Sequence, residues 1–261
     1  MRLRTHWLWF AGYFLLLCAP AAFAIRAAEA PASLTGTWDV IQVAVDANDQ
    51  PHWLYEPNDP RLLGRELEIS GSEISLNDNS RTCRKPVWVA SGKIALHALI
   101  GKSFKRPPHF GTAPYPSLSD FGLKLKDALV TQRRVGCTPA DTDWRQAWFV
   151  SPTPDTLLTN YADGVVLVLQ RRSQESEVKP SFSCAKAQGS SERTICESSA
   201  LAGYDRSVTA AYRRALNRAD DKGEGLRREQ EAWIKQRDAC GPDVNCLAKT
   251  MRERVDELMQ D

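Results

Sequence analysis

The chain has 261 residues, with 34 Lys or Arg and 32 Asp or Glu, so its formal net charge is only +2. This near balance excludes proteins that bind nucleic acids or anionic membranes mainly through a strong positive charge. The length suits one large domain or two modest ones.

The first 24 residues have the pattern of a secretory signal peptide. Arg2 and Arg4 precede an apolar run, and Ala22-Phe23-Ala24 places small residues at the two positions that a signal peptidase reads. We therefore expect cleavage before Ile25 and a periplasmic or secreted protein. The apolar run is short for a membrane span, so an uncleaved anchor is the alternative and no stable membrane insertion is expected.

The cysteines predict disulfides. Cys18 follows the large Leu17, whereas a lipoprotein signal needs a small residue there, so Cys18 is expected to leave with the signal peptide, with lipidation as the alternative. Its removal takes seven cysteines to an even six, which in an exported chain is typical of disulfides. Chain order suggests three pairs: Cys83–Cys137, Cys184–Cys196 and Cys240–Cys246. Other pairings stay possible, whereas a zinc site is disfavoured because no common ligand spacing is present, and no cofactor is expected.

Residues 32–170 are predicted to form an antiparallel β-barrel or sandwich. Short segments rich in alternating or β-branched apolar residues are the strand candidates: 38–45, 66–70, 73–76, 86–90, 93–99, 121–125, 144–150, 156–161 and 165–170. Gly71-Ser72 and Asp163-Gly164 predict hairpin turns. Residues 101–120 are rich in proline and predict a long loop that serves as a lid or a contact arm.

The period of the apolar residues changes after residues 171–180, a polar segment that predicts a linker. Residues 181–261 carry apolar residues at helical spacing, and the predicted helices are 191–196, 199–219, 224–239 and a last helix with Asn245 as its N-cap. Gly241-Pro242 is expected to end the third of these. The prediction is an α+β two-domain protein, in which a barrel precedes a small disulfide-linked helical bundle.

Trp233, Arg237 and Asp238 form the densest motif of the helical region. Trp233 and Arg237 are four residues apart and share a helix face. In one interpretation the arginine and the carboxylate are presented to a partner. In the other, which we favour, Trp233 is a core residue covered by the stem of Arg237, and Asp238 pairs locally.

The helical region resembles the LprI-like lysozyme-inhibitor family of exported bacterial proteins. The resemblance covers about residues 181–259 and keeps all four cysteines in order. Besides the cysteines, it is carried by Tyr204, Asp205, Tyr212, Gln230, Trp233, Arg237 and Asp238. It implies a small disulfide-linked helical domain and a protein partner of the lysozyme type. It brings no residue-level binding motif, so the target-binding residues are not assigned.

A second, weaker resemblance concerns the first strand. Gly36-Thr37-Trp38 is similar to the Gly-x-Trp of lipocalins, in which the tryptophan closes one end of the barrel. The resemblance implies a lipocalin-like barrel with room for a small apolar ligand. A structural tryptophan in another β fold is the alternative.

No catalytic motif is present, so an enzyme is not expected. The mature chain would keep His52, His97 and His109, which are scattered, and no Gly-x-Ser-x-Gly, His-Glu-x-x-His or phosphate loop occurs. The favoured function is therefore an exported protein that inhibits a lysozyme-type peptidoglycan-cleaving enzyme by occluding its cleft. The alternatives are a carrier of a small apolar or lipid ligand, and an envelope immunity or adaptor protein for a dedicated toxin.

Overall fold

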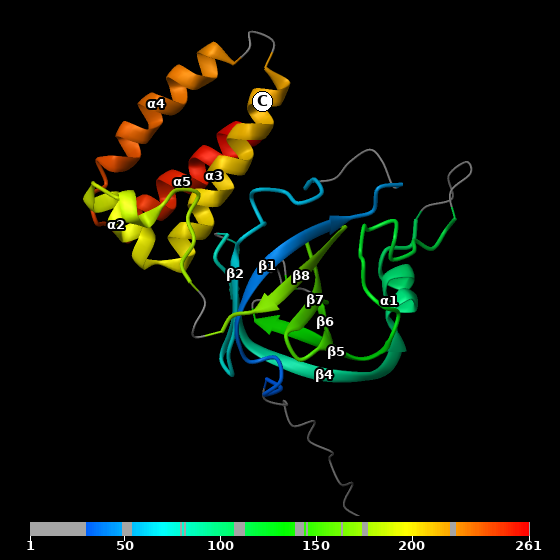
Figure 1. Ribbon diagram of the computed structural model, residues 1–261. Coiled ribbons are helices and arrows are strands. Elements are labelled where there is room, and N and C mark those ends of the chain that lie inside the picture. The colour runs from blue at the N-terminus through cyan, green and yellow to red at the C-terminus, as the bar shows by residue number, and fades with distance from the viewer. Residues whose placement is uncertain are drawn as a thin grey trace, which may run out of the picture.

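The computed structural model describes residues 30–48, 54–78, 80, 82–106, 113–138, 144, 146–162, 164–173, 177–219 and 223–260. The predicted signal peptide and Cys18 lie outside the described residues, as do Asp163 of the predicted hairpin turn and residues 174–176 of the predicted linker. The described chain forms a β-barrel followed by a helical bundle (Figure 1).

Within these ranges, eight antiparallel strands close the barrel in chain order, and the last strand pairs with the first. They are β1 (Gly36–Val45), β2 (Glu66–Ile69), β3 (Glu73–Leu76), β4 (Cys83–Ala95), β5 (Leu129–Thr138), β6 (Trp148–Thr153), β7 (Thr156–Tyr161) and β8 (Val165–Arg171). The predicted antiparallel barrel is confirmed. β8 reaches one residue into the predicted linker.

The barrel has two apolar layers because successive side chains of a strand point to opposite faces. In β8, Val165, Leu167 and Leu169 belong to the interior cluster, whereas Val166 and Val168 belong to an outer cluster. The outer cluster is covered by helix α1 (Leu96–Ser103) and by residues 118–125. Both faces of β8 are therefore buried, which explains its uninterrupted apolar sequence.

Aromatic side chains fill the barrel interior. Trp88 and Phe149 have ring centroids 5.1 Å apart, and Trp144 lies 4.9 Å from Tyr161 by the same measure. Each of these four side chains is at most 4% exposed. This packing occupies the space that an apolar ligand inside the barrel would need.

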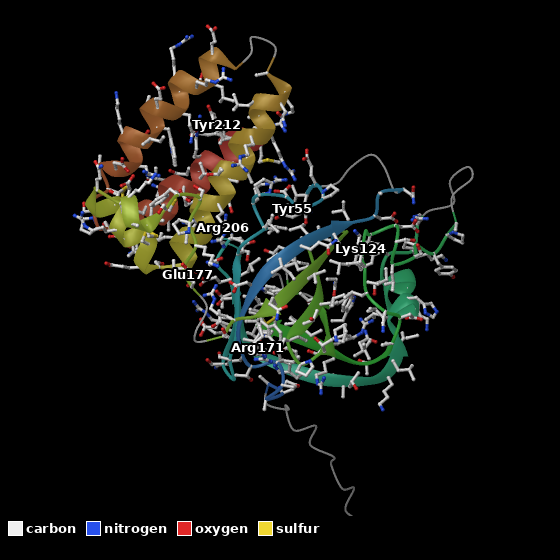
Figure 2. All side chains as sticks on the ribbon, in the orientation of Figure 1. Tyr55, Lys124, Arg171, Glu177, Arg206 and Tyr212 are labelled. Atoms are coloured by element: carbon white, nitrogen blue, oxygen red, sulfur yellow. A yellow bond between two sulfur atoms is a disulfide. The ribbon has the colours of Figure 1, made fainter. Side chains whose placement is uncertain are left out.

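Trp38, near the start of β1, is part of the interior cluster of the barrel. Its indole Nε1 donates a hydrogen bond of 2.9 Å to the Leu34 carbonyl, and the side chain is fully buried. The guanidinium of Arg171 lies 4.0 Å above the ring centroid, and Figure 2 labels this arginine at the end of β8. The arrangement agrees with the lipocalin-like expectation for Gly36-Thr37-Trp38.

The strand prediction for residues 93–99 is wrong in its second half. β4 runs without a break from Cys83 to Ala95, with a bulge at Ser91-Gly92, where Gly92 has a φ of +86°. From Leu96 onward the chain is α1, in which Leu96, Leu99 and Ile100 are buried at helical spacing. A short apolar segment is compatible with the period of a strand and with that of a helix. Here the helix forms because it packs its apolar residues against the outer face of the barrel.

Two further strand assignments change. Residues 121–125 form no strand, because Gly122 has a φ of +62° and the segment packs Phe121 and Leu123 onto the outer face of the barrel. β5 was not predicted. Its apolar residues lie on opposite faces, with Val130 in the outer cluster and Val135 in the interior, so they give no alternation.

Arg106 fixes both flanks of the predicted proline-rich loop. Its Nε and Nη2 donate to the two oxygens of Asp46 at 2.6 and 2.7 Å, and Nη2 is 2.9 Å from Asp120. Its Nη1 also donates to the Ala113 carbonyl. Of the predicted loop, residues 101–103 end α1 and residues 107–112 lie outside the described chain.

The Asp120 carboxylate makes the stability of this region dependent on pH. Hydrogen bonds from Ser117, followed by those from Arg106, hold its pKa below the usual value. Because the folded pKa lies below the unfolded one, its contribution is present above about pH 4 and is lost as the pH falls through the folded value. We expect Asp120→Asn to reduce the loss of thermal stability of the protein between about pH 5 and pH 2. An unchanged acid dependence in this variant would contradict the assignment.

The helical bundle consists of a 3₁₀ turn, η1 (Cys184–Lys186), and the helices α2 (Ser190–Glu197), α3 (Ser199–Arg218), α4 (Glu224–Asp238) and α5 (Val244–Gln260). α3 packs along α5, and α2 and α4 complete the bundle (Figure 1). Ile195, Leu201, Met251 and Val255 are among its core residues. The predicted disulfide-linked helical bundle is confirmed.

Asn245 is not the N-cap of α5. The carboxylate of Asp243 accepts the backbone N–H groups of Asn245 and Cys246 at 2.9 and 3.1 Å. The helix thus begins two residues earlier than predicted, because Asp243 reaches the free amides of the first turn.

The structure joins Cys83 to Cys137, Cys184 to Cys196, and Cys240 to Cys246. The first bridge links β4 to β5 in the barrel. The other two link η1 to α2 and the end of α4 to the start of α5. Each bridge lies within the barrel or within the bundle.

Candidate functional site

The signature residues of α4 are engaged within the bundle. Trp233 is 8% exposed, and the Arg237 guanidinium lies 5.7 Å from the centroid of its ring. Arg237 Nη2 is 2.7 Å from the Asp238 carboxylate, and the Gln230 side chain accepts a hydrogen bond of 3.1 Å from Arg254. Tyr212 packs partly buried against the same core. These side chains make their contacts within the bundle.

Asp205 connects three segments of the chain. One carboxylate oxygen accepts the backbone N–H of Ser181 at 2.5 Å, and the other is 3.9 Å from Arg237 Nη1. The neighbouring Arg206 donates to the Lys179 carbonyl, and Figure 2 labels Arg206 near Glu177. The end of the predicted linker, at Lys179, and the following Ser181 are thus fastened to α3.

Tyr204 belongs to the junction between the bundle and the barrel. Its hydroxyl donates to the Asn77 carbonyl at the end of β3. Its ring is covered by the guanidinium of Arg65, which lies 3.9 Å from the centroid. Tyr204 therefore contacts the barrel, in addition to the bundle core that it helps to form.

The backbones of the two parts come close together at a pair of glycines. A Cβ atom added to Gly203 of α3 would lie 2.5 Å from the Gly64 carbonyl oxygen. Gly64 has a φ of +78°, which favours glycine at that position. Ser207, one helical turn after Gly203, places its Oγ 3.1 Å from the Leu63 carbonyl oxygen.

Arginines extend the junction on both sides of these glycines. Arg214 of α3 is 2.8 Å from the Glu56 carboxylate and donates to the Pro57 and Asn58 carbonyls. Arg172, just after β8, is paired with Asp39 and with Glu66 of the barrel and donates to Ser199 of α3.

A cavity of about 440 Å³ lies at this junction, between the segment before β2 and helix α5. Seven charged side chains take part in its lining: Arg61, Arg65, Asp78, Lys249, Arg252, Glu253 and Asp256. Figure 2 labels Tyr55, another lining residue, on the side of the barrel that faces the bundle.

The outer face of the bundle is formed by α4. Figure 1 shows this helix on the side of the bundle away from the barrel. Apart from Trp233 and Arg237, none of the described side chains of α4 is fully buried. Arg228 and Lys235 are exposed, lie seven residues apart on one helix face, and have no ion pair in the described part of the chain.

Of the three histidines expected in the mature chain, His97 lies within the described residues and pairs with a single carboxylate. His97 Nδ1 is 2.6 Å from Asp127, and both side chains are exposed, whereas His52 and His109 lie outside the described residues. Hydrogen bonds from His97 lower the pKa of Asp127. The described residues contain no group of three or more His, Cys, Asp or Glu that is placed to hold a metal ion. Nor do they include a helix with the length and apolar character to cross a membrane.

Of the junction residues, the sequence analysis singled out Tyr204 but not the glycines or the arginines, although one signal was available. Gly203 interrupts a well-patterned helix, and an isolated glycine in a helix often marks close packing. Arg65, Arg252 and Asp256 carried no such signal, because charged residues in a polar stretch usually face solvent. Only the meeting of the barrel and the bundle brings them together.

The described chain is thus a closed antiparallel barrel that carries a disulfide-linked helical bundle, with its signature side chains engaged in the bundle and at the junction. Residues 184–258 match the family model described as lysozyme inhibitor LprI. The bundle is therefore an LprI-type domain, which covers less than a third of the chain and leaves the barrel outside the match. No protein with a curated description and no solved structure matches the chain.

Proposed function

We propose that this protein is an exported inhibitor that binds a lysozyme-type peptidoglycan-cleaving enzyme and occludes its cleft. The observation that carries the proposal is the match of residues 184–258 to the lysozyme inhibitor LprI family. Because the bundle is cross-linked twice, it would lose little conformational entropy when it binds. The signal peptide predicted for residues 1–24 would bring it to the compartment where such enzymes act.

We assign the contact with the target to the outer face of α4. α3 already contacts the barrel through Gly203, Ser207 and Arg214. α4 offers Arg228 and Lys235 about two helical turns apart. Lysozyme-type clefts carry two catalytic carboxylates, and these two cations suit such a pair.

A lytic assay tests the inhibition. Mature protein at about micromolar concentration is expected to slow the clearing of a peptidoglycan suspension by at least one of three enzymes: a c-type lysozyme, a g-type lysozyme or a bacterial lytic transglycosylase. Loss of Arg2 and Arg4 leaves 32 of the 34 basic residues against 32 acidic ones, so salt should change the association rate little. Unaltered clearing by all three enzymes would refute the proposal.

A double charge reversal tests the assigned surface. Arg228→Glu with Lys235→Glu is expected to weaken inhibition by about tenfold or more, because like charges would then meet the catalytic carboxylates. Lys124→Glu with Lys126→Glu is the matched control, since both lysines are exposed on the barrel. Equal losses in the two variants would argue against α4, while leaving inhibition itself in place.

A further inference from the structure

The cavity at the junction of barrel and bundle is lined by charged side chains that are only partly paired with one another. Its volume of about 440 Å³ lies in the range of small-molecule sites. Some of its charges are already neutralised within the protein. Arg61 holds Asp59 through contacts of 2.9 and 2.7 Å, and Lys249 is 3.7 Å from Glu253. The Asp78 carboxylate accepts a hydrogen bond of 2.5 Å from the Tyr161 hydroxyl, which is a neutral donor.

Arg65 is a buried cation without a carboxylate partner in the described chain. The residue is only 1% exposed. Its Nε donates to the Arg61 carbonyl at 3.0 Å and its Nη2 to the Pro60 carbonyl at 3.4 Å, but its Nη1 has no acceptor. Burial lowers the pKa of this guanidinium to about 10. Because an uncompensated buried charge is costly, a negatively charged group nearby would stabilise the Arg65 guanidinium.

Arg252 and Asp256 face the same cavity from α5, one helical turn apart. Arg252 Nη1 is 3.3 Å from the Tyr204 hydroxyl, and its guanidinium lies 5.5 Å from the centroid of the ring that Arg65 also covers. Asp256 makes neither a hydrogen bond nor an ion pair in the described part of the chain. Burial raises its pKa, even though Arg61, Arg65 and Arg252 act in the opposite direction.

Two guanidinium groups and one carboxylate therefore line one cavity without being paired to each other. We propose that the cavity binds a small carboxylate that also carries an amino or hydroxyl group, as α-amino acids and α-hydroxy acids do. The guanidinium groups of Arg65 and Arg252 hold the ligand carboxylate, which suits their planar donor geometry. Asp256 accepts a hydrogen bond from the amino or hydroxyl group. Because Arg65 belongs to the barrel and Arg252 to the bundle, the ligand joins the two parts.

Titration calorimetry and thermal unfolding of the full mature protein test the site. The probes are glycine, D- and L-alanine, D- and L-lactate, acetate and inorganic phosphate, each up to about 10 mM. We expect at least one amino or hydroxy acid to bind and to raise the melting temperature, since it binds only the folded state. Acetate should bind at least about tenfold more weakly, because it has no donor for Asp256.

Variants decide which residues bind. Arg252→Gln and Asp256→Asn should each weaken binding of the best probe by about tenfold or more, whereas Arg213→Gln, an exposed site on α3, should leave it unchanged. Arg252 is used rather than Arg65 because the latter is buried, so its loss would also disturb folding. The proposal fails if no probe binds, if phosphate alone binds, or if Arg252→Gln binds as well as the parent protein. Acetate binding equal to that of glycine would overturn the role of Asp256. None of these results depends on inhibition of a lysozyme.

Discussion

Replacement of Arg106 by methionine is expected to lower the free energy of unfolding by about 3–5 kcal/mol. Arg106 and Asp46 are both buried, and their two hydrogen bonds of 2.6 and 2.7 Å replace the water that each charge has lost. Without the guanidinium, Asp46 would remain as an uncompensated charge inside the protein. Urea unfolding, monitored by tryptophan fluorescence, measures the loss.

A double-mutant cycle separates this effect from a simple loss of packing. If the unpaired Asp46 causes the loss, Asp46→Leu in the Arg106→Met background should recover part of the stability. Lys102→Met is the control, since this exposed lysine is four residues away at the end of α1 and is expected to change stability by less than about 0.5 kcal/mol. A single variant at Arg106 with stability near that of the parent would contradict the argument.

Replacement of Gly203 by alanine is expected to lower the free energy of unfolding by about 1–3 kcal/mol and to loosen the bundle from the barrel. The added Cβ would stand 2.5 Å from the Gly64 carbonyl oxygen, which belongs to the backbone and cannot rotate away. Helix propensity alone predicts the opposite sign, because alanine in a helix interior is favoured over glycine by about 1 kcal/mol. The sign of the measured change therefore distinguishes close packing of the two parts from helix propensity.

The Gly203→Ala variant should also weaken the contact between the barrel and the bundle. We expect a larger radius of gyration by small-angle X-ray scattering and faster proteolysis near residues 173–180. Gly71→Ala is the matched control, because a Cβ added there meets no atom within 4 Å. Unchanged dimensions and proteolysis in Gly203→Ala would show that the contact with Gly64 does not hold the two parts together.

The sequence predicted the architecture better than its boundaries. The antiparallel barrel and the bundle follow from apolar periods and from turn residues such as Gly71-Ser72. Strand β5 was not predicted because its apolar residues are divided between the barrel interior and the outer cluster. This division depends on where α1 packs. The start of α5 shifted because Asp243 and Asn245 are both good caps, and only the geometry shows that Asp243 accepts the free amides.

The candidate sites could be predicted less well. The signature residues Trp233 and Arg237 identify the domain, and the structure places both within it. Arg65, by contrast, is separated from Arg252 by most of the chain, and no local pattern relates them. Their proximity is a property of how a barrel loop meets a helix, which a single sequence does not contain.

The order of the disulfides has a consequence for biosynthesis. The cysteines of the described chain are bonded in consecutive pairs along the sequence, so no bridge encloses or crosses another. Each pair can therefore close as soon as its second member emerges, before any later cysteine is present to compete. The two cysteines of a bridge also lie closer together in sequence towards the C-terminus, with separations of 54, 12 and 6 residues. Oxidative maturation of this chain can thus proceed in one direction, without the reshuffling that interleaved bridges require.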